Sequence, residues 1–318
     1  MSSRREFIKD ASSCAAHIAL AAATTSWLAR QAWAAPMGRV VAAEPFGNLE
    51  KVADGIWALI STPLNNDRTT LSNGGLIAGR NGVLAIEGFM MPEGARWLAN
   101  QSKALTGKWP THVAVTHYHA DHANGVAGYI GDGPHPRMHA TQLTRSQVVE
   151  KNQPADASRT AALGEAVTLD AAAPTTIDLG GRTVRIVPRL GHTSSDITLE
   201  VEDPSVVFCG DLVWNGMIPN YVDAVPTKLA ASVAELRRSR ETTYIPGHGS
   251  VSREADVARY VNVLGEIEQA ARRAIAAGQK PEDAAAAFKL PASLGEWIVF
   301  GPTFYPRAFA AWARELGR

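Results

Sequence analysis

Cysteines and long hydrophobic runs are both scarce in this chain of 318 residues. The two cysteines are Cys14 and Cys209. Because Cys14 falls in a segment that we expect to be removed, the mature chain keeps one cysteine and cannot form an intramolecular disulfide. Basic runs are absent as well, and the chain has no excess of positive charge, because Lys plus Arg and Asp plus Glu each number 31. We therefore expect no nucleic acid partner, because such a partner needs a basic footprint.

The first 34 residues have the features of an export signal. "SRREFIK", Ser3 to Lys9, resembles the twin-arginine consensus, an apolar stretch follows, and "AWA" at Ala32 to Ala34 suits cleavage before Ala35. An attached amphipathic helix or a membrane anchor is the alternative. The apolar stretch is shorter than the roughly 20 residues that a membrane span needs. The sequence thus predicts a signal peptide over 1–34, a periplasmic location reached by the twin-arginine route, and no membrane anchor after cleavage.

The mature chain is rich enough in apolar residues to build a large core, with 46% hydrophobic and 19% charged residues overall. From Gly55 short apolar runs alternate with turns, and Asn81-Gly82 between two such runs predicts a hairpin. A helix is expected over 92–105, beginning at Pro92, and a buried strand in "THVAVTH". The chain therefore begins with antiparallel sheet and continues as strand, helix, strand.

A second run of strands is expected over 183–188, 197–201 and 205–209, followed by a helix in "PTKLAASVAELRRS" and a strand in "TTYIPGHG". Two similar halves with helices outside predict an α/β fold, a four-layer αββα sandwich with one shared core. From about Arg253 the chain becomes Ala-rich and helical. We expect one domain over 35–252 and a C-terminal helical extension over 253–318 that packs on it.

Three histidines and one aspartate gather in "THYHADH", Thr116 to His122, directly after the apolar run "HVAVT". A single histidine at a strand end is usually a hydrogen-bonded surface or core residue. Four such side chains in one loop, His117, His119, Asp121 and His122, indicate a metal site, because imidazole and carboxylate are ligands that suit divalent zinc.

Further candidate ligands follow later apolar strands, in "GHTSSD" (His192), "FCGDLVW" (Asp211) and "IPGHG" (His248). Glycines flank each of them, at 191, 210, 247 and 249, and allow the tight turns that aim short side chains into one pocket. With the order His-x-His-x-Asp-His, then His, Asp and His, the chain resembles the metallo-β-lactamase-fold metallohydrolase superfamily. The resemblance covers about Gly55 to Ser252.

The resemblance implies two zinc ions per chain. His117, His119 and His192 would bind one, Asp121, His122 and His248 the other, and Asp211 would bridge them. Zinc lowers the pKa of bound water to about 7, so a metal-bridging hydroxide would serve as nucleophile and Asp121 would orient it. The expected function is hydrolysis of a small ester, thioester, lactone or amide. The chain looks most like exported metallohydrolases associated with quinoprotein and sulfur-oxidation systems.

Several positions depart from familiar members or lack a firm role. Lactamases with a cysteine ligand carry it at the position of Asp211, with a lysine at the position of Trp214, so the anchor for a lactam carboxylate is missing. Glu87 stands where many members have Asp, and Cys209 is expected to be a buried strand residue. Tyr118 lies within the metal motif and either packs or lines the pocket. Tyr221 either donates to an oxyanion or packs, and Phe89, Met90 and Met91 are expected to form an apolar substrate wall.

Other functions remain open at the level of sequence. They are β-lactamase activity, an iron-dependent redox reaction on sulfur or oxygen, and a protein that holds zinc without turnover. Flavin-linked di-iron members carry Glu at the position of His119, which disfavours the redox alternative. The sequence leaves the oligomeric state open.

Overall fold

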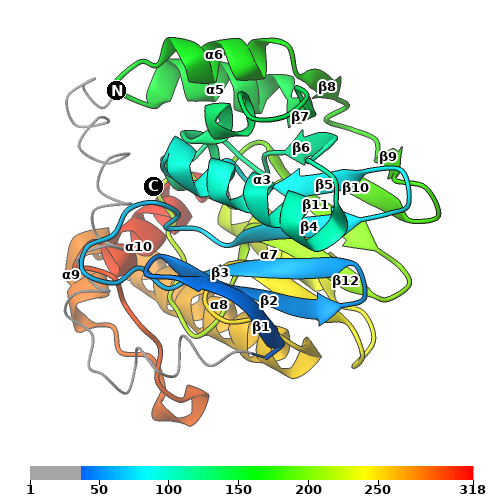
Figure 1. Cartoon of the computed structure of the whole chain (residues 1–318). Helices are drawn as coiled ribbons and strands as arrows, with labels where there is room; N and C mark the ends of the chain where they lie inside the picture. Colours follow the sequence, from blue (N-terminus) through cyan, green and yellow to red (C-terminus); the bar gives the residue numbers. More distant parts are fainter. Residues whose placement is uncertain (1–36, 318) are drawn as a thin grey trace.

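The computed structural model describes residues 37–317, which form two β-sheets packed face to face (Figure 1). The first sheet has the strand order β1 (Arg39–Glu44), β2 (Gly47–Ala53), β3 (Ile56–Ser61), β4 (Gly74–Ala78), β5 (Val83–Ile86), β6 (His112–Ala114), β7 (Arg137–Thr141) and β8 (Val167–Leu169). The second has the order β13 (Thr243–His248), β12 (Val206–Trp214), β11 (Asp196–Val201), β10 (Thr183–Arg189) and β9 (Thr175–Asp178).

The helices lie between and after these strands. They are α3 (Pro92–Thr106), α4 (Ala120–Ala123), η1 (Val126–Tyr129), α5 (Gln142–Lys151), α6 (Ala157–Gly164), α7 (Pro226–Leu236), α8 (Glu254–Ala276), α9 (Pro281–Ala287), η2 (Ala292–Leu294) and α10 (Phe304–Glu315). No helix among residues 37–317 is both long and apolar enough to cross a membrane.

The first sheet changes from antiparallel to parallel at β5. The expected hairpin joins β4 to β5 through Asn81 and Gly82, and its antiparallel register pairs Leu76 with Ala85. The parallel pairing of β5 with β6 needs a crossover, and α3 supplies it. The helix begins with Pro92 in its first turn and ends at Gly107, whose φ of 74° caps it in the left-handed conformation.

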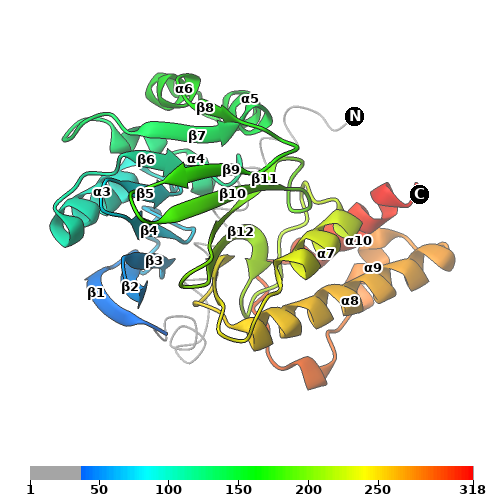
Figure 2. The same ribbon diagram turned by 90° about the vertical axis from the view of Figure 1, so that its right-hand side faces the viewer.

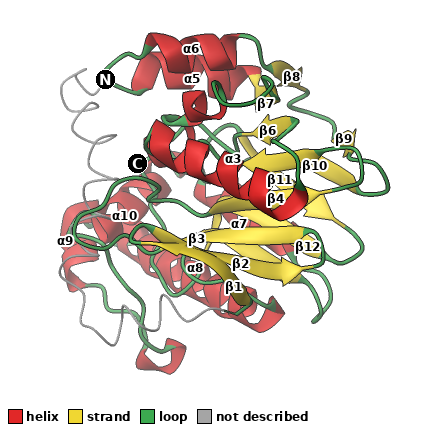
Figure 3. Ribbon diagram, viewed as in Figure 1, coloured by secondary structure: helices red, strands yellow, loops and turns green. Residues whose placement is uncertain are grey.

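Three apolar clusters separate four layers, which confirms the predicted αββα sandwich (Figures 2 and 3). The middle cluster lies between the sheets and includes Ile77, Leu199 and Phe208. A second cluster lies between the first sheet and α3, and a third between the second sheet and the helices α7, α8 and α10. Each sheet thus buries both faces, which explains why β3 and β12 are buried along their whole length.

The helices after Arg253 share the third cluster with β12 and α7. Phe304, Phe309 and Trp312 of α10 and Tyr260 and Ile267 of α8 are all buried in it. The apolar residues of these helices recur at helical spacing, so each helix presents one stripe to the sheet. The predicted signal peptide, residues 1–34, lies outside the described residues.

Two features of the fold differ from the expectations. Sheet begins at Arg39 rather than near Gly55, because β1 and β2 pair as an antiparallel edge beside β3. Strand β12 runs on from Val206 to Trp214, so Asp211 lies inside a strand and not after one. Irregular pairing with β13 between Phe208 and Trp214 is what allows Asp211 to face the site from within the strand.

Candidate metal centre

The loop after β6 places the first candidate ligands at the edge that the two sheets share. The Thr116 carbonyl accepts a 3.0 Å hydrogen bond from the Ile197 amide of the second sheet, and His117 follows it directly. His119 precedes the single turn of α4, which carries Asp121 and His122. One short stretch of chain thereby delivers four polar side chains at the shared edge of both sheets.

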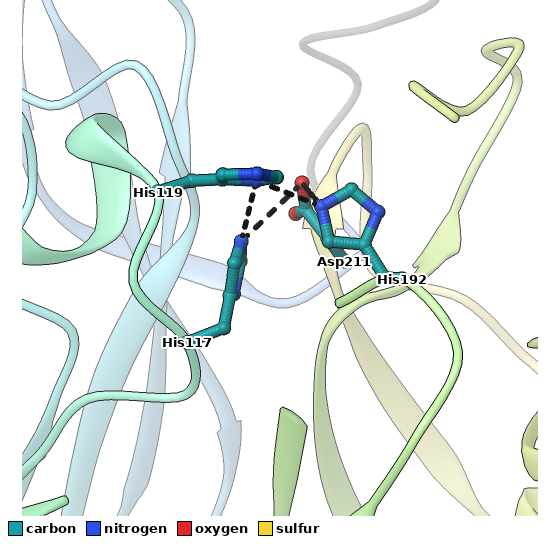
Figure 4. A group of neighbouring side chains, drawn as sticks. All are labelled: His117, His119, His192 and Asp211. Atoms are coloured by element: carbon teal, nitrogen blue, oxygen red, sulfur yellow. Dashed lines mark hydrogen bonds and ion pairs between the residues drawn. The ribbon is translucent and has the colours of Figure 1, made fainter. Parts of the chain in front are cut away.

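Four residues form the first group, which consists of His117, His119, His192 and Asp211 (Figure 4). Nδ1 of His119 lies 3.1 Å from Nε2 of His117 and 2.9 Å from Nε2 of His192. All four residues are buried, and His119 is the most exposed at 8%. Three imidazole nitrogens therefore converge on one point from three directions.

The second group consists of Asp121, His122 and His248, all buried. Nε2 of His122 and Nε2 of His248 lie 3.1 and 3.2 Å from Oδ1 of Asp211. The other oxygen, Oδ2, lies 3.2 Å from Nε2 of His192 and 3.9 Å from Nε2 of His117. The two oxygens of one carboxylate thus face the two groups separately.

The unsatisfied atoms of this cluster fit cations. Within these seven residues, five buried atoms make no hydrogen bond, namely Asp121 Oδ2, His122 Nε2, His192 Nδ1, Asp211 Oδ1 and His248 Nε2. Four of the five belong to the second group or to Asp211, the carboxylate that faces it. Buried polar atoms without partners are costly, so the concentration of these four here indicates a ligand that accepts lone pairs from all of them. Nitrogen and oxygen donors in this combination suit a divalent transition metal such as zinc.

The pKa shifts in the site have opposite directions in the two groups. Burial lowers the pKa of His192 to about 3, and burial with the neighbouring His122 and His119 lowers the pKa of His117 well below its ordinary value. Burial also acts to lower the pKa of His122, but Asp211, Glu87 and Asp121 outweigh it and raise that pKa well above its ordinary value. His117 and His192 are therefore held neutral, whereas the carboxylates around His122 favour positive charge at that position.

Glu87 supports one ligand of each group. Its carboxylate accepts the Thr116 amide at 3.1 Å and the Thr116 hydroxyl at 2.5 Å, and Nδ1 of His122 lies 3.0 Å from Oε1. Since the Thr116 hydroxyl gives its proton to Glu87, it accepts from Nδ1 of His117 at 3.0 Å. Both histidines then carry their proton on Nδ1 and keep Nε2 for a metal.

Asp223 supports His119 in the same way. Nε2 of His119 donates to Oδ2 of Asp223 at 3.1 Å, which leaves Nδ1 for the converging point. The Tyr118 hydroxyl donates to the same oxygen, and Nζ of Lys151 lies 3.7 Å from Oδ1. Burial acts to raise the pKa of Asp223, but His119, Tyr118 and Lys151 outweigh it and hold the pKa well below its usual range.

Backbone conformation fixes the positions of His192 and Asp211. The Asp196 carboxylate accepts the amides of His192 and Thr193 at 2.9 Å, which closes the loop that carries His192. Burial raises the pKa of Asp196 to about 7. A Cβ at position 247 would lie 1.9 Å from Oδ1 of Asp211, so only glycine allows β13 to approach that carboxylate.

The remaining candidates fall in the core. Tyr221 is 2% exposed within the cluster under α8 and α10, and burial and Glu268 raise its pKa. This position favours packing, one of the two roles that the sequence allowed for Tyr221. Cys209 is fully buried in β12, as expected, and burial raises its pKa.

The expected apolar wall is wrong for one of its three members. Phe89 is fully buried, and its ring would lie 2.8 Å from a Cβ at Gly74, so it packs between the first sheet and α3. Met91 is 43% exposed, and Met90 is half-buried against the third cluster. Trp214 is fully buried, so it does not replace the lysine that anchors a lactam carboxylate.

Sequence reasoning missed Asp223 and the roles of Thr116, Asp196 and Glu87. Asp223 lies 104 residues from His119 in a loop before α7, and no local pattern marks it. A search for carboxylates at turns beside strand ends would have selected Asp196, because "HTSSD" is a turn sequence.

The sequence profile of the Metallo-beta-lactamase superfamily matches residues 68–248. A hydroxyacylglutathione hydrolase from Acidiphilium cryptum is 29% identical over 207 residues, which cover 65% of this chain and 74% of that protein. An atrochrysone carboxyl ACP thioesterase from Aspergillus fumigatus is 27% identical over 207 residues, 64% of this chain and 44% of that protein. A hydroxyacylglutathione hydrolase from a Synechococcus strain aligns over 45% of its length, and the chain spans about half the length of most of these curated relatives.

Solved structures share the architecture. The sec-alkylsulfatase Pisa1 from Pseudomonas sp. superposes with a TM-score of 0.67 at 16% identity, covering 85% of this chain and 50% of that one. A metallo-beta-lactamase from Pontibacter korlensis superposes with a TM-score of 0.56 at 18% identity, covering 68% of this chain and 98% of that one. With the fold, the ligand order and a profile that spans more than half of its residues in agreement, the chain belongs to the metallo-beta-lactamase superfamily.

Proposed function

We propose that this protein is a di-zinc hydrolase that cleaves a thioester of a small acyl group. The observation that carries the proposal is the position of Asp211, whose two oxygens face two separate groups of histidines 3.1–3.9 Å away. A carboxylate placed in this way would offer one oxygen to each of two cations. The names of the relatives from Acidiphilium cryptum and Aspergillus fumigatus support thioesters over the other acyl compounds that this chemistry serves.

The residues of the chain divide the work. In the first group His117, His119 and His192 would hold one zinc, and in the second Asp121, His122 and His248 would hold the other. Bound zinc supplies a water with a pKa near 7 and a Lewis acid for the developing oxyanion. Asp121 Oδ2 lies 3.5 Å from Nε2 of His248, and we assign it the orientation of the attacking water.

Hydrogen bonds outside the ligands keep the site ready for the metal. Thr116 and Asp223 fix the tautomers of His117 and His119, and Glu87 accepts from Nδ1 of His122, so each ring turns its other nitrogen toward the metal position. Because these carboxylates are buried or half-buried, their hydrogen bonds are little weakened by water. The geometry is thereby set before substrate arrives.

A substrate panel with controlled metal content tests the proposal. Purified mature protein should contain close to two zinc ions and hydrolyse thioesters faster than matched esters, lactones, amides and β-lactams. His119→Ala should remove turnover while circular dichroism stays unchanged. Metal-free wild type that still hydrolyses its substrates contradicts the proposal. Strong absorbance from bound iron in the purified protein would favour the iron-dependent redox function instead.

We also propose that the protein is exported to the periplasm by the twin-arginine route, supported by "SRREFIK" and by "AWA" before Ala35. Replacing Arg4 and Arg5 together by lysine should abolish the processed form in the periplasmic fraction. Replacing Lys9 by arginine serves as the control and should leave export intact. Processed protein that still accumulates in the periplasm after the double change would refute this route.

A further inference from the structure

The indole ring of Trp214 separates a ligand of the second group from the C-terminal segment. Its centroid lies 4.1 Å from the centroid of His248, with an angle of 41° between the rings. The ring centroids of Phe300 and Phe304 lie 6.0 and 6.3 Å from it, and the ring centroid of His192 lies farther than that of His248, at 6.5 Å. Trp214 is fully buried, and its Nε1 makes no hydrogen bond with any described residue. Packing alone therefore orients the ring.

Backbone hydrogen bonds also connect His248 to the C-terminal segment through the residues that follow Trp214. The Asn215 amide donates to the His248 carbonyl at 3.0 Å. The next residue, Gly216, accepts from the Ile298 amide at 2.9 Å, and the Ile298 carbonyl accepts from Ile218 at 2.9 Å. The end of β13, the end of β12 and residues 296–298 thus lie side by side, with the C-terminal segment as the outer member.

Helix α10 fixes this segment to the loop after β12. The Glu315 carboxylate accepts from the Thr227 amide at 3.1 Å, and Nη2 of Arg314 donates to the Ala224 carbonyl at 2.9 Å. Nη1 of Arg307 donates to Oδ1 of Asn220 at 3.3 Å. Both ends of the helix are therefore attached, and Phe304 at its start is held over Trp214.

We propose that residues 296–304 position His248 through Trp214 and thereby set the affinity of the second metal ion. This inference rests on the proposed function, because it assumes that two metal ions bind. The histidines at 117, 119 and 122 are oriented by hydrogen bonds to Thr116, Asp223 and Glu87. His248 instead packs against an aromatic ring that the C-terminal extension holds in place. The helical extension is then part of the metal centre.

Two phenylalanines of α10 give a matched pair of variants. Phe304 contacts Trp214, whereas Phe309 lies in the same cluster with its ring 5.6 Å from Phe288. Their exposures are 0% and 3%, so truncation should destabilise the fold similarly. Zinc titration against a chromophoric chelator should show the second site about tenfold weaker in Phe304→Ala and within about twofold of wild type in Phe309→Ala.

Variants of the ring itself complete the test. Trp214→Ala should weaken the second site at least as much as Phe304→Ala, and Trp214→Phe should restore most of the affinity, because it keeps an aromatic face against His248. Cobalt substitution should show the change only in the bands of the second ion. If Phe304→Ala does not fold, Phe304→Leu takes its place.

The outcomes separate this inference from the proposed function. If wild-type protein binds only one zinc ion per chain, whatever its affinity, both the proposed function and this inference are overturned. Wild type with two ions, together with equal second-site affinities in Phe304→Ala and Phe309→Ala, would overturn the inference alone. Equal loss at both sites in Trp214→Ala would also overturn it, because the effect would then be general.

Discussion

The two ligand groups are neighbours that share Asp211, yet they are held by different means. In the first group, hydrogen bonds orient His117 and His119, and the Asp196 turn fixes the backbone of His192. In the second group, Glu87 orients His122, while His248 packs on Trp214. Carboxylates surround His122 and raise its pKa, whereas the pKa values of His117 and His192 are lowered.

This difference indicates how a two-metal site can have unequal halves. Neutral imidazoles fixed by polar partners bind a cation with little reorganisation. A half that depends on negative charge and on distant packing loses affinity when either is disturbed. The first site is therefore expected to bind tightly, and the second to respond to changes in the surrounding structure.

The largest effect should follow from removing the residue that both halves share. Asp211→Ala takes an oxygen from each group, but the first keeps three imidazoles, so we expect loss chiefly of the second metal. Transition-state stabilisation should fall by about 4 kcal/mol or more, since the oxyanion loses one Lewis acid. Zinc titration with kcat/KM measures both. Simultaneous loss of both metals, or retention of both with full activity, would mean that Asp211 is not the bridge.

A change at Asp223 should act on the first site alone. Asp223→Ala removes the acceptor for Nε2 of His119, so we expect the first metal to bind about 10–100-fold more weakly and the second to be unaffected. Asp223→Asn should retain part of the affinity, because the amide oxygen still accepts a hydrogen bond. Asp54→Asn, an exposed carboxylate far from the ligands, is the control. Equal weakening of both sites would remove the distinction between them.

Glu87→Gln should weaken both sites by a smaller and similar factor, about tenfold each. Glu87 accepts from Thr116, which orients His117, and from His122, so it supports one histidine of each group. Calorimetric titration with zinc resolves the two steps. A loss confined to one site would show that only one of these hydrogen bonds matters.

The last prediction concerns a buried histidine outside both groups, and it leaves metal binding unchanged. His139 is 5% exposed, neither ring nitrogen makes a hydrogen bond to a described residue, and burial lowers its pKa to about 4. Above pH 6.5 it is neutral in both folded and unfolded chains. As the pH falls from 6.5 towards 4 only the unfolded chain gains the proton, so stability is lost, by about 2 kcal/mol at pH 5.

His139→Phe should remove that loss. Urea unfolding of wild type and variant at pH 7.5 and pH 5.0 measures it, and the double difference cancels the ligands that titrate in both proteins. A difference that does not change with pH would show that His139 is solvated or paired. It would then no longer illustrate what burial does to a histidine without a carboxylate beside it.

The seven candidate ligands, which the structure brings together in two groups, were predictable because each stands in a local sequence pattern at the end of a strand or beside a glycine. His117 and His122 follow an apolar strand. Gly247 marks the point where β13 must come close to Asp211 of β12. Strand and helix patterns likewise predicted the four layers. Local rules suffice where the periodicity of one segment decides which face is buried.

Two supporting residues, Asp223 and Phe304, were not predictable for the opposite reason. Asp223 meets His119, and Phe304 meets Trp214, only because layers distant in sequence pack together. Phe89 was assigned to the substrate wall from its place in a loop beside the site, but a φ of 59° turns the ring into the core. Strand β12 was expected to stop before Asp211, and irregular pairing with β13 extends it.

The order of the elements along the chain determines when the residues of each group are synthesised. All members of the first group have been made once Asp211 is added, whereas the second also requires His248 and, by our inference, the segment that ends at Phe304. That segment is made roughly ninety residues after Asp211, a delay of roughly 5–20 s at ordinary rates of translation. Under the proposed function, the residues for the first metal ion are therefore complete in the growing chain before those for the second.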